Sequence, residues 1–511
     1  MKVHKIINIL FLVIFIFCIS LPLLNVNLVP GRVSSSENRK LADFPKLYSH
    51  DDKVNLNINE DFENWFNDNL GFRDEINIIN TKLQYHLFGK LTKTDALLGK
   101  DGWIYYITPE IIKDYQNLNL PDEKQLNYWS TSLNNIKLFL DQRDISFLSM
   151  LVLDKKTIYP EYYPDTIYKV GNKSRTDMLV EYITSKTNIE FFTPKDALIK
   201  AKEEAILYSP RVDQGHWNEY GAFIGYQELM KKVSKYIPGV KILTFDDFAV
   251  DQYINQSSIY NAIPIEETSY KFNLKAKTAN LVPDKLSGLD LKQPHNCHYY
   301  VNDIKSYPKA LVFGDSYFTP IVAPWLAESF SETAFIHTSN INRLYELTET
   351  LSPDIVIFEQ VERMFDTTMD NLANQNIRKV EEGIESLPIV ASKKSELLWL
   401  DMINDASVEN QREIKIGQGV DRVSLVGWAI DPNNDSTASA IYVKVGDQYY
   451  SGNYGIERAS VAEYFNNDAL RYSGFIFDLN AEELLNSGEI SFLIISKDGS
   501  YRYEPVIIKV R

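Results

Sequence analysis

Apolar residues are grouped along this chain in three different ways. Near the N-terminus, Ile9–Leu24 reads ILFLVIFIFCISLPLL without a charged residue. In the middle of the chain, short apolar runs bounded by polar residues alternate with stretches of helical spacing, which predicts buried parallel strands separated by helices. From about residue 407 onward, apolar and polar residues alternate at every second position, and this pattern predicts antiparallel strands.

The N-terminal stretch is long enough to cross a membrane. No charged residue lies between Lys5 and Arg32, and about 20 apolar residues span the ~30 Å hydrocarbon core of a bilayer. Lys2 and Lys5 precede the stretch, so the positive-inside rule leaves the N-terminus in the cytoplasm and the rest of the chain outside. We therefore predict an uncleaved signal anchor at residues 1–31. A cleaved signal peptide is the main alternative and a buried core helix the third, and no A-x-A site supports cleavage.

Four apolar runs in the middle of the chain indicate buried strands. They are ISFLSMLVLD (Ile145–Asp154), KALVFGDS (Lys309–Ser316), ETAFIHT (Glu332–Thr338) and PDIVIFE (Pro353–Glu359). Helical stretches such as GAFIGYQELMKKVSKY separate them, so residues 58–391 are predicted to form an α/β domain, a parallel sheet with helices on both faces. The polar residues 32–57 are predicted to be a tether.

The last hundred residues predict a separate all-β domain. Runs such as RVSLVGWAID, SGFIFDLN and EISFLIISK are bounded by Gly, Asn and Asp. This pattern is typical of an antiparallel sandwich, which we place at residues 407–511. The charged segment 392–406 has no clean period and is predicted to be a linker.

The composition and the net charge of the chain argue against several classes of protein. Hydrophobic residues make up 44% and charged residues 24% of the chain, which excludes disorder as its main state. The 69 acidic and 53 basic side chains give a net charge of −16, which argues against a nucleic-acid partner. Cys18 and Cys297 are the only cysteines, and Cys18 lies in the apolar stretch. An internal disulfide framework and a cysteine-built zinc site are therefore excluded.

Gly314-Asp315-Ser316 directly follows one of the predicted strands. A serine on the turn from a strand into a helix exposes its Oγ, and backbone N–H groups at the helix start can stabilise an oxyanion. Ser316 is therefore a candidate nucleophile. The alternative is structural, with Ser316 capping a helix and Asp315 forming a turn, and so short a motif alone favours that alternative.

One of the seven histidines has a carboxylate at a suitable spacing. His216 lies three residues after Asp213 in the loop DQGHWN. A serine nucleophile needs a base with a pKa near neutrality, and the imidazole needs a carboxylate to hold its tautomer. We therefore predict Ser316, His216 and Asp213 as a catalytic triad. A structural histidine beside a packed Trp217 is the alternative.

Neighbouring residues are expected to shape the site. The strand Pro353–Glu359 reaches the same sheet edge as Ser316 if the two strands are parallel neighbours, and Arg363 follows it. Together with the serine itself, we assign Tyr317, Glu359 and Arg363 to the oxyanion-binding and site-shaping set.

Three further residues are candidates for substrate binding. They are Trp217 and Asn218, which follow His216, and Trp103 in GKDGWIYY, whose ring is a candidate sugar platform, with core packing as the alternative. Lys155 and Lys156 are expected to be a solvated strand end. The cluster His295–His298 is too crowded for a closed metal site and has no evident fourth ligand, so no metal is predicted.

Six segments resemble, in order, the SGNH/GDSL hydrolase superfamily and its alginate O-acetyltransferase branch of the AlgX/AlgJ type. They are ENRKLADFPKL, FENWFNDNLGFRDEI, GKDGWIYY, DQGHWNEYGAF, FGDSYF and PDIVIFEQVER, between Glu37 and about Val390. This branch usually has an aspartate two residues before the histidine, whereas Gln214 holds that place here and Asp213 stands one residue further away.

The resemblance implies an SGNH-like fold and an O-acetyltransferase. Ser316 would be the nucleophile, His216 the base and Asp213 its orienting acid, and a polysaccharide hydroxyl would accept the acetyl group. The resemblance also implies a multi-spanning membrane O-acyltransferase as partner and acetyl donor, with no soluble cofactor. The catalytic domain would be extracytoplasmic on a single-pass cell-membrane anchor.

The C-terminal segments LVGWAID, YGIERASVAEYF and SGFIFDL are similar to an Ig-like accessory module found with polysaccharide-modifying enzymes. Glycan binding, partner docking and a passive β-domain are the alternatives there. For the whole protein, two functions compete with acetyl transfer. One is a glycan O-acetyl esterase that uses the same triad with water as acceptor, and the other is a non-catalytic glycan-binding scaffold.

Overall fold

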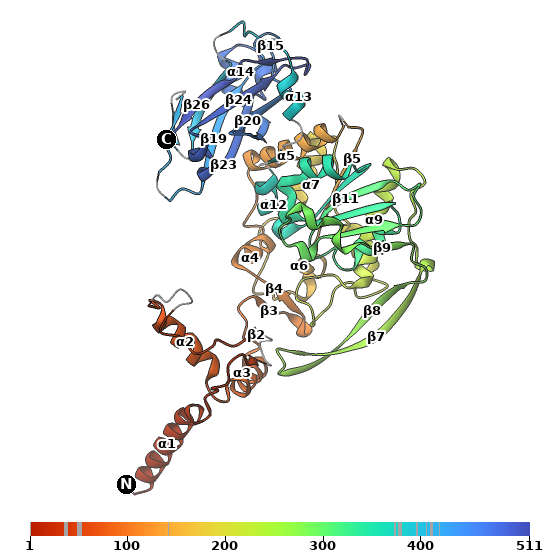
Figure 1. Ribbon diagram of the computed structural model, residues 1–511. Helices are drawn as coiled ribbons and strands as arrows, with labels where there is room; N and C mark the ends of the chain where they lie inside the picture. The colour runs from red at the N-terminus through yellow and green to blue at the C-terminus, as the bar shows by residue number, and fades with distance from the viewer. Residues whose placement is uncertain are drawn as a thin grey trace.

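The computed structural model describes residues 2–34, 39–48, 54–141, 143–372, 375–376, 381–394, 397–404, 406–408, 412–417 and 419–511. An N-terminal apolar helix, a central α/β part and a β-rich C-terminal part follow one another along the chain (Figure 1). The helix is α1 (Lys2–Ser20), which projects from the rest of the molecule. Ile6–Asn25 is unburied and is long and apolar enough to cross a membrane, a property that an N-terminal signal sequence shares.

The central part is built on a mixed sheet that, within the described residues, has seven strands. Five strands are parallel to one another, and β10 and β9 pair antiparallel at one edge. In spatial order the strands are β6 (Glu190–Phe192), β5 (Ser146–Val152), β13 (Ile355–Val361), β11 (Lys309–Gly314), β12 (Glu332–His337), β10 (His298–Asn302) and β9 (Ala279–Leu281). This parallel-rich sheet confirms the predicted α/β fold class.

Helices cover both faces of the sheet, which explains the continuous apolar runs in its strands. Successive residues of β11 enter opposite cores: Val312 packs with α9 (Glu219–Tyr236), and Leu311 packs with α5 (Glu123–Asp141) and α7 (Arg175–Lys186). Every residue of β13 is buried. The other α-helices of the described part are α2 (Ile58–Asn69), α3 (Arg73–Phe88), α4 (Pro109–Tyr115), α6 (Lys155–Ile158), α8 (Lys195–Ala201), α10 (Val322–Ala327), α11 (Leu344–Leu351), α12 (Phe365–Leu372), α13 (Glu381–Ser386), α14 (Ala459–Tyr464) and α15 (Ala481–Ser487).

The C-terminal part consists mainly of antiparallel strands that enclose their own core. One sheet contains β17 (Ala406–Ser407), β16 (Leu398–Ile403), β19 (Arg422–Ala429), β23 (Gly474–Asn480) and β22 (Asn453–Ile456). The other contains β14 (Gln375–Asn376), β21 (Gln448–Ser451), β20 (Ala440–Val445), β24 (Glu489–Ile495), β25 (Arg502–Tyr503), β15 (Ile389–Val390), β18 (Glu413–Ile414) and β26 (Val506–Val510).

Strand β16 lies inside the segment 392–406 that the sequence predicts to be a linker. It pairs antiparallel with β19, so this stretch belongs to the C-terminal sheet. A six-residue strand between charged segments is too short to show a period of its own. Residues 395, 396 and 405 of the predicted linker lie outside the described residues, as do 35–38 and 49–53 of the predicted tether. The domain limits therefore stay predictions.

A long hairpin that the sequence does not predict extends from the central part (Figure 1). Strands β7 (Phe248–Ile259) and β8 (Ile263–Leu274) pair along their whole length. Most of β7 is exposed and polar, so it lacks the apolar pattern of a buried strand. The tip of the hairpin packs against α3 and against the short strands β3 (Ala96–Leu98) and β4 (Ile104–Tyr106).

Candidate active site

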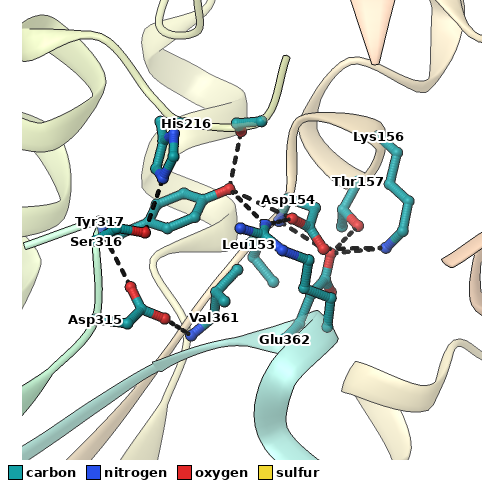
Figure 2. A network of polar contacts seen from close by, with 12 residues as sticks. Leu153, Asp154, Lys156, Thr157, His216, Asp315, Ser316, Tyr317, Val361 and Glu362 are labelled. Carbon is teal, nitrogen blue, oxygen red and sulfur yellow. Dashed lines mark hydrogen bonds and ion pairs between the residues drawn. The ribbon is translucent and has the colours of Figure 1, made fainter. Parts of the chain in front are cut away.

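Ser316 lies just beyond the end of β11, at the carboxyl edge of the parallel strands. Its side chain is exposed, whereas the adjacent Asp315 is buried and tied to β13 (Figure 2). The Asp315 carboxylate accepts hydrogen bonds from the backbone N–H groups of Tyr317 and Val361, at 2.8 Å each. Asp315 therefore fixes the turn that presents Ser316 to solvent.

His216 faces Ser316 from the loop that precedes α9 (Figure 2). Its Nε2 lies 2.9 Å from Ser316 Oγ, and its Nδ1 lies 3.0 Å from Asp213 Oδ2. An ionised carboxylate only accepts hydrogen bonds, so Nδ1 carries the proton and Nε2 is left to accept from the serine hydroxyl. The structure thus brings Ser316, His216 and Asp213 together in the order that a serine nucleophile requires.

Two backbone groups hold Asp213 in place. Its Oδ1 accepts from the N–H groups of Gly215 and His216, at 2.7 Å each. Burial alone would raise the pKa of Asp213, but the hydrogen bond and charge of His216 and these backbone donors outweigh burial and hold the pKa well below its ordinary value. Asp213 is therefore ionised at neutral pH and available to stabilise an imidazolium.

Buried aromatic residues join the His216 loop to the Ser316 turn. The Tyr317 hydroxyl donates to the carbonyl of Gly215 at 2.8 Å, and Trp217 Nε1 donates to the carbonyl of Tyr317 at 2.9 Å. Tyr317 also packs against the His216 ring, with ring centroids 4.9 Å apart. The two segments are a hundred residues apart in sequence, and these bonds set their relative position.

Trp217 and Asn218 are not placed to bind substrate, contrary to the sequence expectation. Trp217 is only 3% exposed. The side chain of Asn218 caps α9 by accepting from the N–H groups of Tyr220 and Gly221, at 3.0 Å each. The aromatic and amide groups that suit a sugar also suit a core and a helix cap, and only tertiary structure separates these roles.

Trp103 does not form an open sugar platform, because other aromatic rings cover it. It is 6% exposed. Its ring stacks on Tyr162, at 4.4 Å between centroids and 6° between planes, and packs against Tyr159 at 4.6 Å. None of the contacts described for Trp103 is with Ser316 or His216. Its indole packs against neighbouring tyrosine rings.

Arg363 belongs to a buried ionic network at the ends of β5 and β13, with Asp154, Lys156 and Glu362 as further members. Its guanidinium donates to the Asp154 carboxylate and to the Tyr317 hydroxyl. Glu362 accepts from Lys156 Nζ at 3.1 Å and from the Asp154 N–H at 3.0 Å. Arg363 therefore contacts the turn that carries Ser316 through Tyr317.

Lys156 and its neighbour Lys155 do not form a solvated strand end: they are 3% and 1% exposed. Their partners come from distant parts of the chain, such as Glu362 and the Asp213 carbonyl, which no local pattern predicts. Glu267 of β8 likewise contacts the loop before Asp213, and a glutamate in a strand gives no sequence signal that it is buried.

Glu359 is fully buried beneath the turn that carries Ser316. One oxygen accepts from the Asp315 N–H at 2.9 Å, and the other has no hydrogen-bond partner within the described residues. Burial, followed by the charge of Asp315, raises the pKa of Glu359 well above its ordinary value. Burial therefore favours the protonated form of Glu359, which supports the turn and does not reach the surface.

Glu359→Gln is expected to stabilise the protein increasingly as the pH rises. Because the folded-state pKa is raised, the folded protein keeps a proton that the unfolded chain loses above about pH 4, so the wild-type free energy of unfolding falls from there upward. Glutamine cannot ionise. Urea unfolding should therefore give similar stabilities near about pH 4 and a more stable variant near about pH 8.

Glu362→Gln is the matched control with the opposite sign. Burial alone would raise the pKa of Glu362, but Lys156 and its other donors lower it. The stability that Glu362 contributes is present above its ordinary pKa and is lost as the pH falls, so this variant should be destabilised at neutral pH. If the free energies of unfolding of wild type and Glu359→Gln changed with pH in parallel, the assignment of a raised pKa to the buried Glu359 carboxyl would be contradicted.

Within the described residues, no group of three His, Cys, Asp or Glu side chains is arranged to hold a metal ion. In the cluster His295–His298, the Cys297 sulfur accepts from the His337 N–H at 3.4 Å, and His298 begins β10. Burial raises the pKa of the Cys297 thiol. These contacts place the cluster at the start of β10, beside β12.

No family model and no curated protein matches this chain in sequence. Solved structures that it resembles include Bacillus cereus PatB1 with a sulfonyl adduct (17% identity, 53% of this chain and 95% of that chain, TM-score 0.41). They also include the O-acetyltransferase domain of Pseudomonas putida AlgJ (15%, 53% and 92%, 0.35) and Pseudomonas aeruginosa AlgX (12%, 81% and 90%, 0.35). AlgJ and AlgX are thus among the solved structures to which this chain is similar, as its sequence motifs indicate.

Proposed function

We propose that this protein is a serine-dependent O-acyltransferase that moves an acetyl group to a hydroxyl of a polysaccharide. One observation carries the proposal: His216 lies between Ser316 Oγ and the Asp213 carboxylate, 2.9 and 3.0 Å away. This arrangement activates a hydroxyl for attack on a carbonyl carbon. The acetyl group and the glycan acceptor rest on the motif resemblance in the sequence.

The reaction has two halves that use the same base. His216 Nε2 takes the Ser316 proton while Oγ attacks the acetyl carbonyl, and the imidazolium returns the proton to the leaving group as it departs. This leaves an acetyl ester on Ser316. A glycan hydroxyl then gives its proton to His216 and attacks the ester, and the proton passes back to Ser316 Oγ as the acetylated glycan leaves. Asp213 stabilises the imidazolium in both halves.

The oxyanion of each tetrahedral intermediate needs preorganised donors. The Ser316 N–H is the best candidate for such a donor, because no acceptor for this N–H is found among the residues that the structure describes. The neighbouring Tyr317 N–H is already donated to Asp315. Glu359 accepts from the Asp315 N–H, and Arg363 donates to the Tyr317 hydroxyl, so within this proposal Tyr317, Glu359 and Arg363 are assigned to supporting the turn.

The apolar segment Ile6–Asn25 supports an anchoring role within the same proposal. The helix would hold the catalytic part outside the cytoplasmic membrane, beside a multi-spanning membrane protein that delivers the acetyl group. Deleting residues 1–25 separates the anchor from the chemistry, because Ser316 and His216 belong to the central part.

Glycan O-acetyl ester hydrolysis is the second candidate, and the exposure of the site favours it. Ser316 is exposed and His216 is half-buried, so water reaches the hydrogen bond between them. A site open to water lets water compete with a glycan hydroxyl for the acetyl-serine. Acceptor chemistry therefore decides between transfer and hydrolysis.

An acceptor assay separates these functions. The purified protein is given an activated acetate ester with and without neutral and uronic-acid oligosaccharides, and acetylated products are quantified by mass spectrometry. Transfer predicts acetylated oligosaccharide at the expense of free acetate. An esterase releases free acetate alone, and a scaffold releases neither. Failure of every oligosaccharide to accept acetyl, with rapid acetate release, would contradict the transferase proposal.

A further inference from the structure

The loop 209–213 leads into the triad acid and lies between the isolated bridge at Tyr208 and the His216 turn. The described backbone–backbone hydrogen bonds pair its Pro210 carbonyl with the Ile104 N–H of β4, at 2.8 Å, and leave most of its other backbone groups to side chains. Buried backbone groups must nevertheless be paired, so other parts of the protein have to satisfy them. Two buried charged side chains do so from different elements.

Lys155 satisfies the carbonyl groups. Its Nζ donates to the carbonyl oxygens of Ile104, Ser209 and Asp213, at 2.7, 2.6 and 2.5 Å. An ammonium has three hydrogens, and all of them are used. Burial lowers the pKa of Lys155 to about 7, although the charges of Asp213 and Glu267 oppose this. Three backbone carbonyl groups, one of which belongs to Asp213, thus accept hydrogen bonds from this one buried side chain.

Glu267 satisfies the N–H groups of the same loop. One carboxylate oxygen accepts from the Ser209 hydroxyl at 2.6 Å, and the other accepts from the N–H groups of Arg211 and Val212, at 2.9 and 3.2 Å. Ser209 Oγ in turn accepts from the Asp213 N–H at 2.8 Å. Glu267 is 8% exposed and belongs to the long hairpin.

We propose that Lys155 and Glu267 are positioning residues for the triad, because together they fix both backbone groups of Asp213. This inference rests on the proposed function. Lys155 binds the Asp213 carbonyl directly, and Glu267 holds the Asp213 N–H through Ser209. With its backbone fixed, the carboxylate of Asp213 stays within reach of His216 Nδ1. Burying either charge is costly unless it is fully paired. Two of the three Lys155 hydrogen bonds, and all of those described for Glu267, are made to this loop.

The test uses the full-length protein and an activated acetate ester. Lys155→Met and Glu267→Gln are expected to lower kcat by about 10- to 100-fold, as for a catalytic group displaced by a fraction of an ångström to one ångström, with KM nearly unchanged. The matched controls are Lys202→Met and Glu266→Gln. Lys202 donates to the Ile158 carbonyl, and Glu266 is the exposed neighbour of Glu267 that accepts from Gln256. The controls should keep wild-type kcat.

A double-mutant cycle separates positioning from general disruption. In an Asp213→Asn background, Lys155→Met and Glu267→Gln should change the rate of fluorophosphonate labelling by less than about 2-fold, because residues that act through one group are not additive. An undiminished loss in that background would overturn the proposal.

Ser209→Ala provides a milder test if a buried charge proves necessary for folding. It removes only the hydroxyl between Glu267 and the Asp213 N–H, and it should lower kcat without changing KM. A folded Ser209→Ala with wild-type kcat would overturn the role of Glu267, and a wild-type kcat in Lys155→Met would overturn that of Lys155. If the wild type neither turns over ester nor labels at Ser316, the proposed function itself fails.

Discussion

Replacing Ser316 with alanine is expected to abolish hydrolysis of activated acetate esters and labelling by fluorophosphonates. Without the hydroxyl there is no nucleophile and no acetyl-serine, so we expect the rate to fall by about 10⁴- to 10⁶-fold. Ser316 is exposed and His216 is its side-chain partner. The unfolding midpoint in urea should therefore stay close to that of the wild type.

A second serine–histidine pair offers a matched control at the neighbouring strand end. Ser339 Oγ lies 2.9 Å from His337 Nδ1, which also accepts from the Ser339 N–H. Ser339→Ala should therefore retain both activity and labelling. Loss of activity in Ser339→Ala, or its survival in Ser316→Ala, would show that the nucleophile is misassigned.

Asp213→Asn is expected to lower kcat by about 10²- to 10⁴-fold, because an amide N–H directed at Nδ1 favours the wrong imidazole tautomer. An asparagine oxygen can still accept from the N–H groups of Gly215 and His216, so the loop should persist. The pKa of Asp213 is lowered, so its effect is present above its ordinary pKa and is lost only in acid. The wild type should therefore remain faster than the variant throughout the range from about pH 6 to about pH 9.

Asp165→Asn is the control for this substitution. Asp165 pairs with Lys100 at the surface, and its side chain is 87% exposed. It should leave kcat unchanged at every pH. Wild-type activity in Asp213→Asn would contradict the D-x-x-H assignment and leave His216 without its orienting group.

The sequence predicts those parts of the site that depend on residues close to one another in the chain. The apolar run before Ser316 predicts a buried strand and a turn at its end, and β11 has both. The spacing of Asp213 and His216 places both on one turn, and a single tight loop brings carboxylate and ring into contact. Continuous apolar runs separated by helical stretches likewise predict the parallel sheet, since its buried strands are apolar on both faces.

The remaining features depend on contacts between distant segments. Trp217 looks like a sugar-binding residue until its neighbours cover it, and Lys155 looks solvated until three carbonyl groups surround it. The side chain of Asn218 caps a helix whose first turn is not distinctive in the sequence. The hairpin that carries Glu267 has one strand, β7, that is exposed along most of its length, so the pattern of that strand resembles that of a loop.

Trapping the acyl-enzyme tests the central claim most directly. The full-length protein is mixed with an activated acetate ester, quenched in acid within its first turnovers and digested for peptide mass spectrometry. The account predicts one acetyl ester on Ser316, absent from Ser316→Ala and discharged by an oligosaccharide acceptor. Turnover without any acetyl group on Ser316, or acetylation of a different residue that an acceptor discharges, would contradict it.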